Sequence, residues 1–247
     1  MKLLRTIYWL VVAFFATLLG AFCLPVFWFL NIARRKGLRQ KLAYRYAHWW
    51  GKVVLDATGS KVTVKGLERI PSGPVVFMAN HLSAFDTMLV LGYLDKPLAF
   101  VAKKELARVP VINPLMRQVG CLYLDREDIR QAVKVIHLAA DQARNGLSMV
   151  IFPEGTRSLT GEVGEFKSGS MKLATKAGVP IVPVCIQGTR HIYESNGHRI
   201  EPSQISLQVM PPILPEEYKE LGSSRLARLV REMVEEGHTQ IAQETEE

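Results

Sequence analysis

A histidine and an aspartate, His81 and Asp86, stand close together in this chain and could carry out proton transfer. They follow an apolar run over residues 74–79 and precede a helical pattern, which places both at a turn between a strand and a helix. Imidazole is well suited to accept a proton near neutral pH. A carboxylate bonded to its second nitrogen would fix the tautomer and stabilise the imidazolium. The pair therefore predicts a general base with its orienting partner.

A structural interpretation of the same residues stays open. Ser83 and Asp86 have the spacing of a capping box, in which Ser83 caps the helix and Asp86 reaches back to the Ser83 amide. On that interpretation Asp86 is structural and His81 is only a polar residue of the turn. Both roles are compatible if one oxygen of Asp86 caps the helix and the other orients His81.

A second group of residues could bind phosphate. Residues 153–158 (Pro-Glu-Gly-Thr-Arg-Ser) follow an apolar strand, and the proline and glycine favour a turn with close backbone approach to a ligand. A guanidinium offers a planar fork suited to phosphate, and hydroxyls add further donors. A tight loop with a buried Arg–Glu pair is the structural alternative. The candidates are Arg126, Glu154, Gly155, Thr156, Arg157 and Ser158, with Glu154 orienting the arginines or accepting from a substrate hydroxyl.

Three lysines stand near these segments. Lys103 and Lys104 follow the apolar run 98–102, and Lys167 follows residues 153–158 along the chain. They could face a phosphate, the phosphopantetheine of a carrier or a lipid headgroup. Solvated charges fit the pattern equally well.

The elements that must position these residues alternate between short apolar runs and helical patterns. Such alternation predicts an α/β domain with a largely parallel sheet flanked by helices. Ligands of such sheets gather at the carboxyl ends of the strands, where the candidate residues stand. The expected strands are 62–64, 75–79, 98–102, 121–124, 148–152, 181–186 and 206–209, and the expected helices are 86–93, 128–144, 168–177 and 224–236. The tail after Gly237 is polar and is expected to fray.

The N-terminal segment predicts a retained membrane anchor. Residues 6–33 carry no charge and exceed the apolar core of a secretory signal peptide, which is about 7–15 residues. Pro25 would kink or end a helix. Residues 7–24 alone would span about 27 Å, which is marginal for a bilayer core of about 30 Å. A kinked spanning helix and a helix that returns on the same side both stay open, because basic residues flank the segment at both ends.

Residues 38–57 predict a second, shallower membrane contact. Apolar and aromatic side chains recur there at helical spacing among basic ones, which suits the headgroup interface. An amphipathic helix packed on its own domain is the alternative. We therefore divide the chain into membrane-anchoring helices over residues 1–58 and an α/β domain over residues 59–247.

Composition restricts the class of partner. The 247 residues carry a formal charge of +8, which favours an anionic membrane surface, phosphorylated substrates or nucleic acid. Nucleic acid would explain the charge but neither the anchor nor the candidate residues, so no such partner is expected. Three distant cysteines, Cys23, Cys121 and Cys185, argue against a disulfide framework or a zinc site and for a reducing compartment.

Four segments together resemble the glycerolipid acyltransferase family, and within it the bacterial 1-acylglycerol-3-phosphate acyltransferases. The resemblance covers about residues 60–215, and the apolar N-terminus is also similar to that of the family. The fold that it implies is the α/β fold of glycerol-3-phosphate acyltransferases. The matching segments are 80–86 (the His-x4-Asp motif), 120–126 (Gly-Cys-Leu-Tyr-Leu-Asp-Arg), 152–158 (Phe-Pro-Glu-Gly-Thr-Arg-Ser) and 179–184 (Val-Pro-Ile-Val-Pro-Val).

The resemblance implies a reaction in which an acyl chain passes from a thioester to the 2-hydroxyl of a 1-acylglycerol 3-phosphate, giving phosphatidate. His81 would take the hydroxyl proton, Asp86 would orient His81, and Arg126 and Arg157 would hold the phosphate. Acyl-coenzyme A or acyl-carrier protein would be the co-substrate, with no cofactor or metal. The expected partners are the bilayer, lysophosphatidic acid and the acyl carrier, at the cytoplasmic face of the inner or plasma membrane.

Three other functions remain as alternatives. A related acyltransferase could use glycerol 3-phosphate, another lysophospholipid or a glycolipid as acceptor. A hydrolase could use His81 and Asp86 to activate water, but the chain has no G-x-S-x-G nucleophile elbow. A non-catalytic module could bind phosphorylated lipid through Arg126 and Arg157, and it would not need His81.

Overall fold

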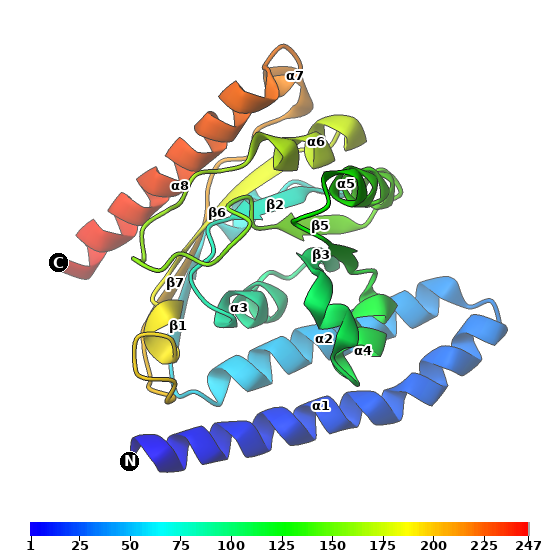
Figure 1. Ribbon diagram of the computed structural model, residues 1–247, viewed down its shortest axis with the longest axis vertical. Coiled ribbons are helices and arrows are strands. Elements are labelled where there is room, and N and C mark those ends of the chain that lie inside the picture. Colours follow the sequence, from blue (N-terminus) through cyan, green and yellow to red (C-terminus); the bar gives the residue numbers. More distant parts are fainter. Residues whose placement is uncertain (247) are drawn as a thin grey trace.

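Seven strands form one sheet at the centre of the molecule, in the order β1-β7-β6-β2-β5-β3-β4 (Figure 1). The structure is a computed structural model, and it describes residues 1–246. Neighbouring strands pair in parallel except for β6 and β7, which are antiparallel. The predicted α/β class with a largely parallel sheet is therefore confirmed. The strands are β1 Lys61–Lys65, β2 Val76–Ala79, β3 Leu98–Lys103, β4 Leu122–Leu124, β5 Ser148–Ile151, β6 Ile181–Gln187 and β7 Gln204–Val209.

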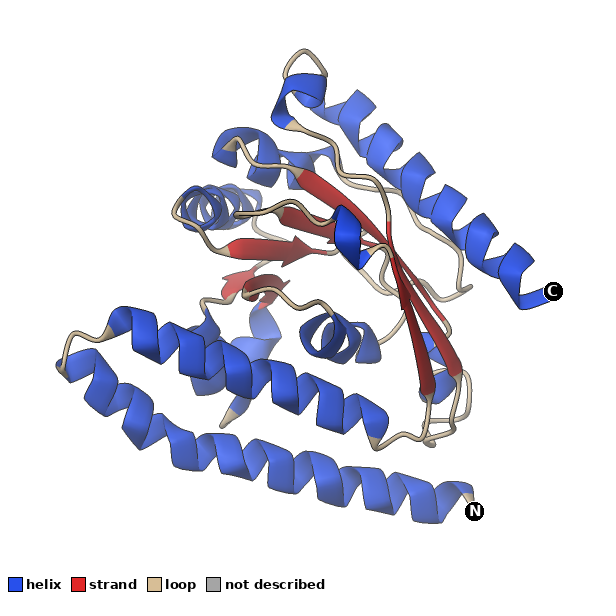
Figure 2. Ribbon diagram, turned by 180° about the vertical axis from the view of Figure 1, so that it is seen from behind, coloured by secondary structure: helices blue, strands red, loops and turns tan. Residues whose placement is uncertain are grey.

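Helices cover both faces of this sheet (Figures 1 and 2). Helices α5, α6 and α8 lie on one face, and α3 and α4 lie on the other. Helix α2 packs beneath α3 and α4, and α1 lies outermost along α2. The helices are α1 Lys2–Ile32, α2 Lys36–Asp56, α3 Phe85–Tyr93, α4 Ile112–Val119, α5 Ile129–Arg144, α6 Ser168–Ala177, α7 Pro215–Tyr218 and α8 Ser223–Glu246.

The central strands are apolar throughout because helices cover them from both sides. All four residues of β2 are fully buried, and β5 and β6 beside it are buried along almost their whole length. Side chains also define the ends of the helices that flank them. Asp128 caps α5 by accepting a hydrogen bond from the Gln131 amide (3.0 Å), and Gly178 ends α6 in the left-handed region (φ 68°).

The C-terminal helix differs from the sequence prediction. Helix α8 does not end at residue 236 but continues to Glu246, so the tail after Gly237 is helical. A Cβ atom on Gly237 would lie 2.9 Å from Cys185 Cβ and 2.8 Å from Met210 Sδ. Gly237 therefore allows α8 to pack closely against β6, and it does not end the helix. Helices α4 and α7 were not predicted, because each is too short for a periodic pattern.

The N-terminal segment is one helix, so of the two outcomes expected at Pro25, a kink or an end, the helix does not end there. Pro25 lies inside α1, which bends toward its C-terminal end (Figures 1 and 2). Side chains of α2 bind the middle of α1: the Tyr46 hydroxyl donates to the Ala16 carbonyl (2.8 Å) and Trp50 Nε1 donates to Thr17 Oγ1 (3.0 Å). The aromatic residues expected at the headgroup interface thus pack partly against α1.

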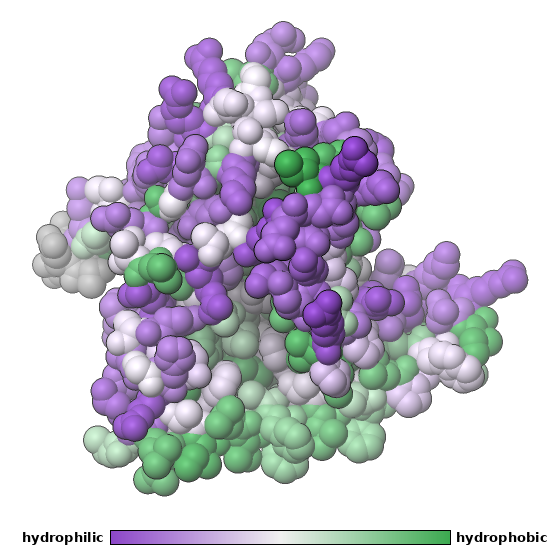
Figure 3. Space-filling view, viewed as in Figure 1, coloured by the Kyte–Doolittle hydropathy of each residue, from purple (hydrophilic) through white to green (hydrophobic). Residues whose placement is uncertain are grey.

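The outer face of α1 is a continuous apolar surface. Its composition and 31-residue length are sufficient to cross a membrane. Figure 3 shows this surface along the lower edge of the molecule, below a domain that is mainly hydrophilic. The exposed large side chains include Leu3, Leu4, Ile7, Tyr8, Leu10, Val11, Phe14, Phe15, Leu19, Phe22, Val26, Trp28, Phe29 and Ile32.

Candidate active site

His81 and Asp86 lie together at the carboxyl end of β2, as the sequence predicted. Asp86 Oδ2 is 2.7 Å from His81 Nδ1, and the Asp86 side chain is fully buried. The carboxylate accepts the proton of Nδ1, so the lone pair of Nε2 remains available for another proton. This is the geometry of a general base with an orienting carboxylate.

The same oxygen of Asp86 also performs the capping role. Oδ2 accepts from the amides of Leu82 (2.6 Å) and Ser83 (2.8 Å) as well as from His81. The other oxygen, Oδ1, accepts from the hydroxyl of Thr189 (2.6 Å), which is fully buried. The expectation that one oxygen caps the helix while the other orients His81 is therefore wrong. Four donors hold the carboxylate, which prevents its rotation.

A neighbouring aromatic ring fixes the plane of the imidazole. The ring of Phe152, just after β5, stacks on His81 with 4.1 Å between ring centroids and an angle of 15°. Strands β2 and β5 are parallel neighbours, so the residues that follow them meet at one edge of the sheet. The side chain of His81 is 14% exposed, which leaves access for one reacting group.

Residues 153–158 are joined to His81 through its backbone. Glu154 Oε1 accepts from the His81 amide (3.0 Å), and the Ser158 amide donates to the His81 carbonyl (2.7 Å). Burial raises the pKa of Glu154, and the hydrogen bond from His81 opposes that shift. Glu154 therefore positions the histidine backbone and forms no ion pair with Arg126 or Arg157.

Arg157 and Arg126 supply positive charge beside the dyad. Arg157 Nη1 lies 3.1 Å from Glu194 Oε1, and its side chain is 52% exposed. The pKa of Arg126 lies below its ordinary value chiefly through desolvation; Glu105 opposes this shift, and Arg157 adds to it. Two cations thus lie close together at one site, which suits a doubly charged phosphate.

Glu194 connects this positive site to the start of α3. Its Oε2 accepts from the Ser83 hydroxyl (2.7 Å), and its Oε1 accepts from the Ala84 amide (3.1 Å) as well as from Arg157. A single carboxylate therefore holds the turn that carries the dyad and the arginine of residues 153–158 in one arrangement.

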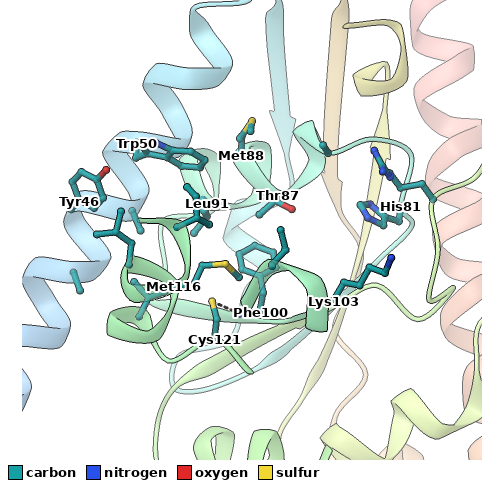
Figure 4. A pocket seen from close by; sticks show the side chains of 18 of the residues that line it. Tyr46, Trp50, His81, Thr87, Met88, Leu91, Phe100, Lys103, Met116 and Cys121 are labelled. Atoms are coloured by element: carbon teal, nitrogen blue, oxygen red, sulfur yellow. Dashed lines mark hydrogen bonds between the residues drawn. The ribbon is translucent and has the colours of Figure 1, made fainter. Parts of the chain in front are cut away.

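An apolar cavity of about 480 Å³ begins at His81 and runs between α2, α3 and α4. Figure 4 shows His81 and Lys103 at one end and Tyr46 and Trp50 at the other. The polar residues of its lining include Lys103, Arg126, Thr156 and Arg157, whereas most of the remaining lining is apolar. The apolar lining comprises Phe27, Ala43, Ala47, Ala84, Met88, Leu91, Phe100, Leu106, Ile112, Leu115, Met116, Val119 and Cys121.

Not every candidate residue faces this cavity. Lys104 binds Asp125 (2.8 Å), and Lys103, which lines the cavity, also contacts Glu105 (3.2 Å). The Ser158 hydroxyl accepts from the Gly161 amide (3.1 Å) and shapes its own loop.

Gly155 and Lys167 do not line this cavity. Gly155 has φ 75° and packs against Lys167, whose Nζ would be 2.9 Å from a Cβ atom at that glycine. Within residues 1–246 no group of three or more His, Cys, Asp or Glu side chains is placed to hold a metal ion.

Sequence reasoning did not identify Thr189 or Glu194. Both belong to the segment after β6, which carries no periodic pattern and no familiar spacing from His81. Position in the sheet could have indicated Thr189, because β6 lies parallel to β2 and ends at the same edge. No feature of the sequence indicated Glu194.

The chain matches the acyltransferase family model over residues 61–187. Among individual proteins, this chain is 33% identical over 214 residues to a probable 1-acyl-sn-glycerol-3-phosphate acyltransferase of Mycoplasma genitalium, covering 82% of this chain and 78% of that protein. A 1-acyl-sn-glycerol-3-phosphate acyltransferase of Borreliella burgdorferi is 32% identical over 184 residues, covering 74% of each chain.

A similar solved structure is the crystal structure of the 1-acyl-sn-glycerophosphate acyltransferase from Thermotoga maritima. The two chains superpose with a TM-score of 0.82, at 30% sequence identity and with 98% of each chain covered. The similarity therefore includes the N-terminal helices as well as the sheet.

Proposed function

This chain belongs to the acyltransferase family, and on that premise we propose that it transfers a fatty acyl group from a thioester to the 2-hydroxyl of 1-acylglycerol 3-phosphate, yielding phosphatidate. One observation carries the proposal. The oriented His81 lies at the end of an apolar cavity whose polar lining includes Arg126 and Arg157. A base, a cationic site and space for an acyl chain thus occur together.

The reaction proceeds by direct transfer between two bound substrates. Nε2 of His81 accepts the proton of the 2-hydroxyl as that oxygen attacks the thioester carbonyl, a contribution typically worth about 10²- to 10⁴-fold in rate. Asp86 stabilises the imidazolium through Nδ1. As the tetrahedral intermediate collapses, the carbon–sulfur bond breaks and the imidazolium returns the proton to the departing thiol. Backbone amides near Gly155 are candidates for stabilising the oxyanion.

The acceptor is held by its phosphate and by its chain. Arg126 and Arg157 bind the phosphate, and Thr156, which also lines the cavity, adds a hydroxyl donor. Lys103 lies at the same end of the cavity and supplements their charge. The apolar lining between α2, α3 and α4 accommodates a fatty chain.

Helix α1 holds the active site against one face of a membrane. Lys2 Nζ pairs with Glu201 Oε1 (2.5 Å), and the Thr6 hydroxyl accepts from the Ile200 amide (2.9 Å), so the N-terminal end of α1 is bound to the domain. Arg39 of α2, at the other end of this helical pair, binds Gln118 of α4 (3.0 Å). Because both ends of the helical pair are bound to the domain, α1 lies along the bilayer and inserts its outer face into one leaflet. The cytoplasmic face of the inner or plasma membrane is the expected site.

An assay with defined substrates tests this function. The purified full-length protein would be given radiolabelled acyl-coenzyme A or acyl-carrier protein, with lysophosphatidate, glycerol 3-phosphate or other lysophospholipids as acceptors. We expect labelled phosphatidate from lysophosphatidate and at least a tenfold lower rate with each other acceptor. A preference for glycerol 3-phosphate or for another lysophospholipid would replace the proposed acceptor.

A further inference from the structure

A second hollow lies on the opposite side of residues 153–158 from the apolar cavity. It is a groove of about 1120 Å³ between α8 and the loop of residues 154–169. Thr156 and Arg157 line both hollows, so the two meet at these residues. Helix α8 and helix α1 lie on opposite sides of the sheet (Figures 1 and 2). The groove therefore faces away from the membrane surface that α1 forms.

The α8 wall of the groove is positively charged, whereas the loop wall carries both signs of charge. Arg228 and Arg231 lie one turn apart on α8, and the loop carries Glu162 and Glu165 together with Arg157 and Lys167. Arg228 is exposed and forms no ion pair or hydrogen bond within the part of the chain that the structure describes. The α8 wall can therefore bind an anion.

Arg231 has one donor that nothing in the described chain satisfies. Its Nη2 binds Glu235 Oε1 (2.7 Å), but its buried Nε has no acceptor among the described residues. A guanidinium N–H without an acceptor is costly. Because the Arg231 side chain is 39% exposed, a change of its rotamer would bring this donor to an anionic ligand in the groove. This observation is independent of the charge count and indicates the same wall of the groove.

The groove also leads to the reacting histidine. Lys167, which lines it, packs against Gly155, and the neighbouring Glu154 accepts from the His81 amide. A ligand with its phosphate at α8 could therefore extend along Lys167 toward the edge of the sheet where His81 lies.

We propose that this groove binds the 4′-phosphopantetheine arm of the acyl donor, with the phosphate at Arg228 and Arg231 and the thioester near Thr156. The assignment rests on the proposed function, which needs a thioester donor. The lipid acceptor approaches from the side of α1, whereas the donor is water-soluble and approaches from the opposite side. Coenzyme A and acyl-carrier protein share this arm, so one site serves either donor.

The test uses the full-length chain with Arg228→Gln and Arg231→Gln combined, and Arg225→Gln as the matched control. Arg225 is an exposed arginine of the same helix that does not line the groove. Loss of two charged phosphate contacts should raise the KM for acyl-coenzyme A and for acyl-carrier protein about tenfold or more. The KM for lysophosphatidate and all constants of the control should stay within about twofold.

Direct titration with coenzyme A separates this proposal from the proposed function. We expect the dissociation constant to rise in the double variant by the same factor as the donor KM. Unchanged donor binding in a variant that still makes phosphatidate would overturn the groove assignment alone. Lost coenzyme A binding, in a protein whose wild type makes no phosphatidate, would support the groove and reject the proposed acceptor.

A second comparison identifies the bound group. A rise in KM for acyl-coenzyme A without a rise for acyl-carrier protein would overturn the assignment to the shared arm. If the double variant does not fold, Arg228→Gln alone gives the same test, because Arg228 is exposed.

Discussion

His81 and the two arginines line the same cavity, but the dyad and the arginines are held in different ways. Asp86 is fully buried and accepts four hydrogen bonds, whereas Arg157 is about half exposed and forms a single ion pair. A group that transfers a proton must keep one geometry throughout the reaction. A group that binds a charged substrate must exchange water for that substrate in every cycle. We therefore expect changes at the dyad to lower the rate and changes at the arginines to lower the affinity for the substrate.

Asp86→Asn should have the largest effect of the substitutions that keep the shape of the dyad. The amide retains an acceptor for the helix amides, but it cannot stabilise an imidazolium and favours the wrong tautomer. We expect kcat to fall about 10²- to 10⁴-fold with little change in the KM for lysophosphatidate. His137→Ala, at an exposed histidine, is the control. An equal fall in kcat in this control would show that the loss is not specific to the dyad.

Thr189→Val tests whether the rigid frame of Asp86 matters beyond the dyad itself. Valine has nearly the same shape but lacks the hydroxyl that donates to Asp86 Oδ1. A hydrogen bond to a charged group is worth about 1.5–3 kcal/mol, so kcat should fall about 10- to 100-fold. Thr189→Ser should restore most of that loss. Equal rates for the valine and serine variants would contradict a positioning role for this hydroxyl.

Arg157→Gln should affect affinity more than rate. The exposed guanidinium is screened by water, so we expect the KM for lysophosphatidate to rise about tenfold while kcat changes less. Arg130→Gln, an exposed arginine of α5 outside the cavity, is the control. A variant at Arg157 with normal binding of lysophosphatidate would remove this residue from the phosphate site.

Glu154→Gln should have the smallest effect, and it should depend on pH. Because burial raises the pKa of Glu154, its contribution to stability is greatest below its unfolded pKa and is lost as pH rises through its folded pKa. Glutamine retains an acceptor for the His81 amide and does not titrate. The midpoint of thermal unfolding of the variant should therefore gain on the wild type as pH rises. A gain of 1 kcal/mol corresponds to about 2–4 °C, and a variant that loses stability relative to the wild type as pH rises would contradict the assignment.

Local patterns in the sequence predict the sheet and the dyad well. Strands buried on both faces appear as apolar runs, so all seven were located, and His81 and Asp86 lie within one turn. The predicted end of α8 was wrong because Gly237 resembles a glycine that ends a helix. Only its contact with Cys185, which the sequence does not reveal, explains why it lies inside the helix. The path of α1 through Pro25 was also open, because packing against α2 decides it.

Long-range contacts explain what the sequence could not provide. Thr189 binds Asp86 and Glu194 binds Ser83, and the two residues of each pair are about a hundred residues or more apart along the chain. Glu194 also binds Arg157. Glu154 was expected to orient arginines, yet it binds the His81 amide. In each case the residue type was visible, but its partner depends on the order of β2, β5 and β6 in the sheet.

The central claim is that His81 removes the proton of an acceptor that the arginines hold. The most direct measurement compares transfer with lysophosphatidate binding in full-length His81→Ala. We expect transfer to fall at least about 10²-fold, while the dissociation constant for lysophosphatidate stays within about twofold of wild type. Transfer at the wild-type rate by this variant would contradict the account.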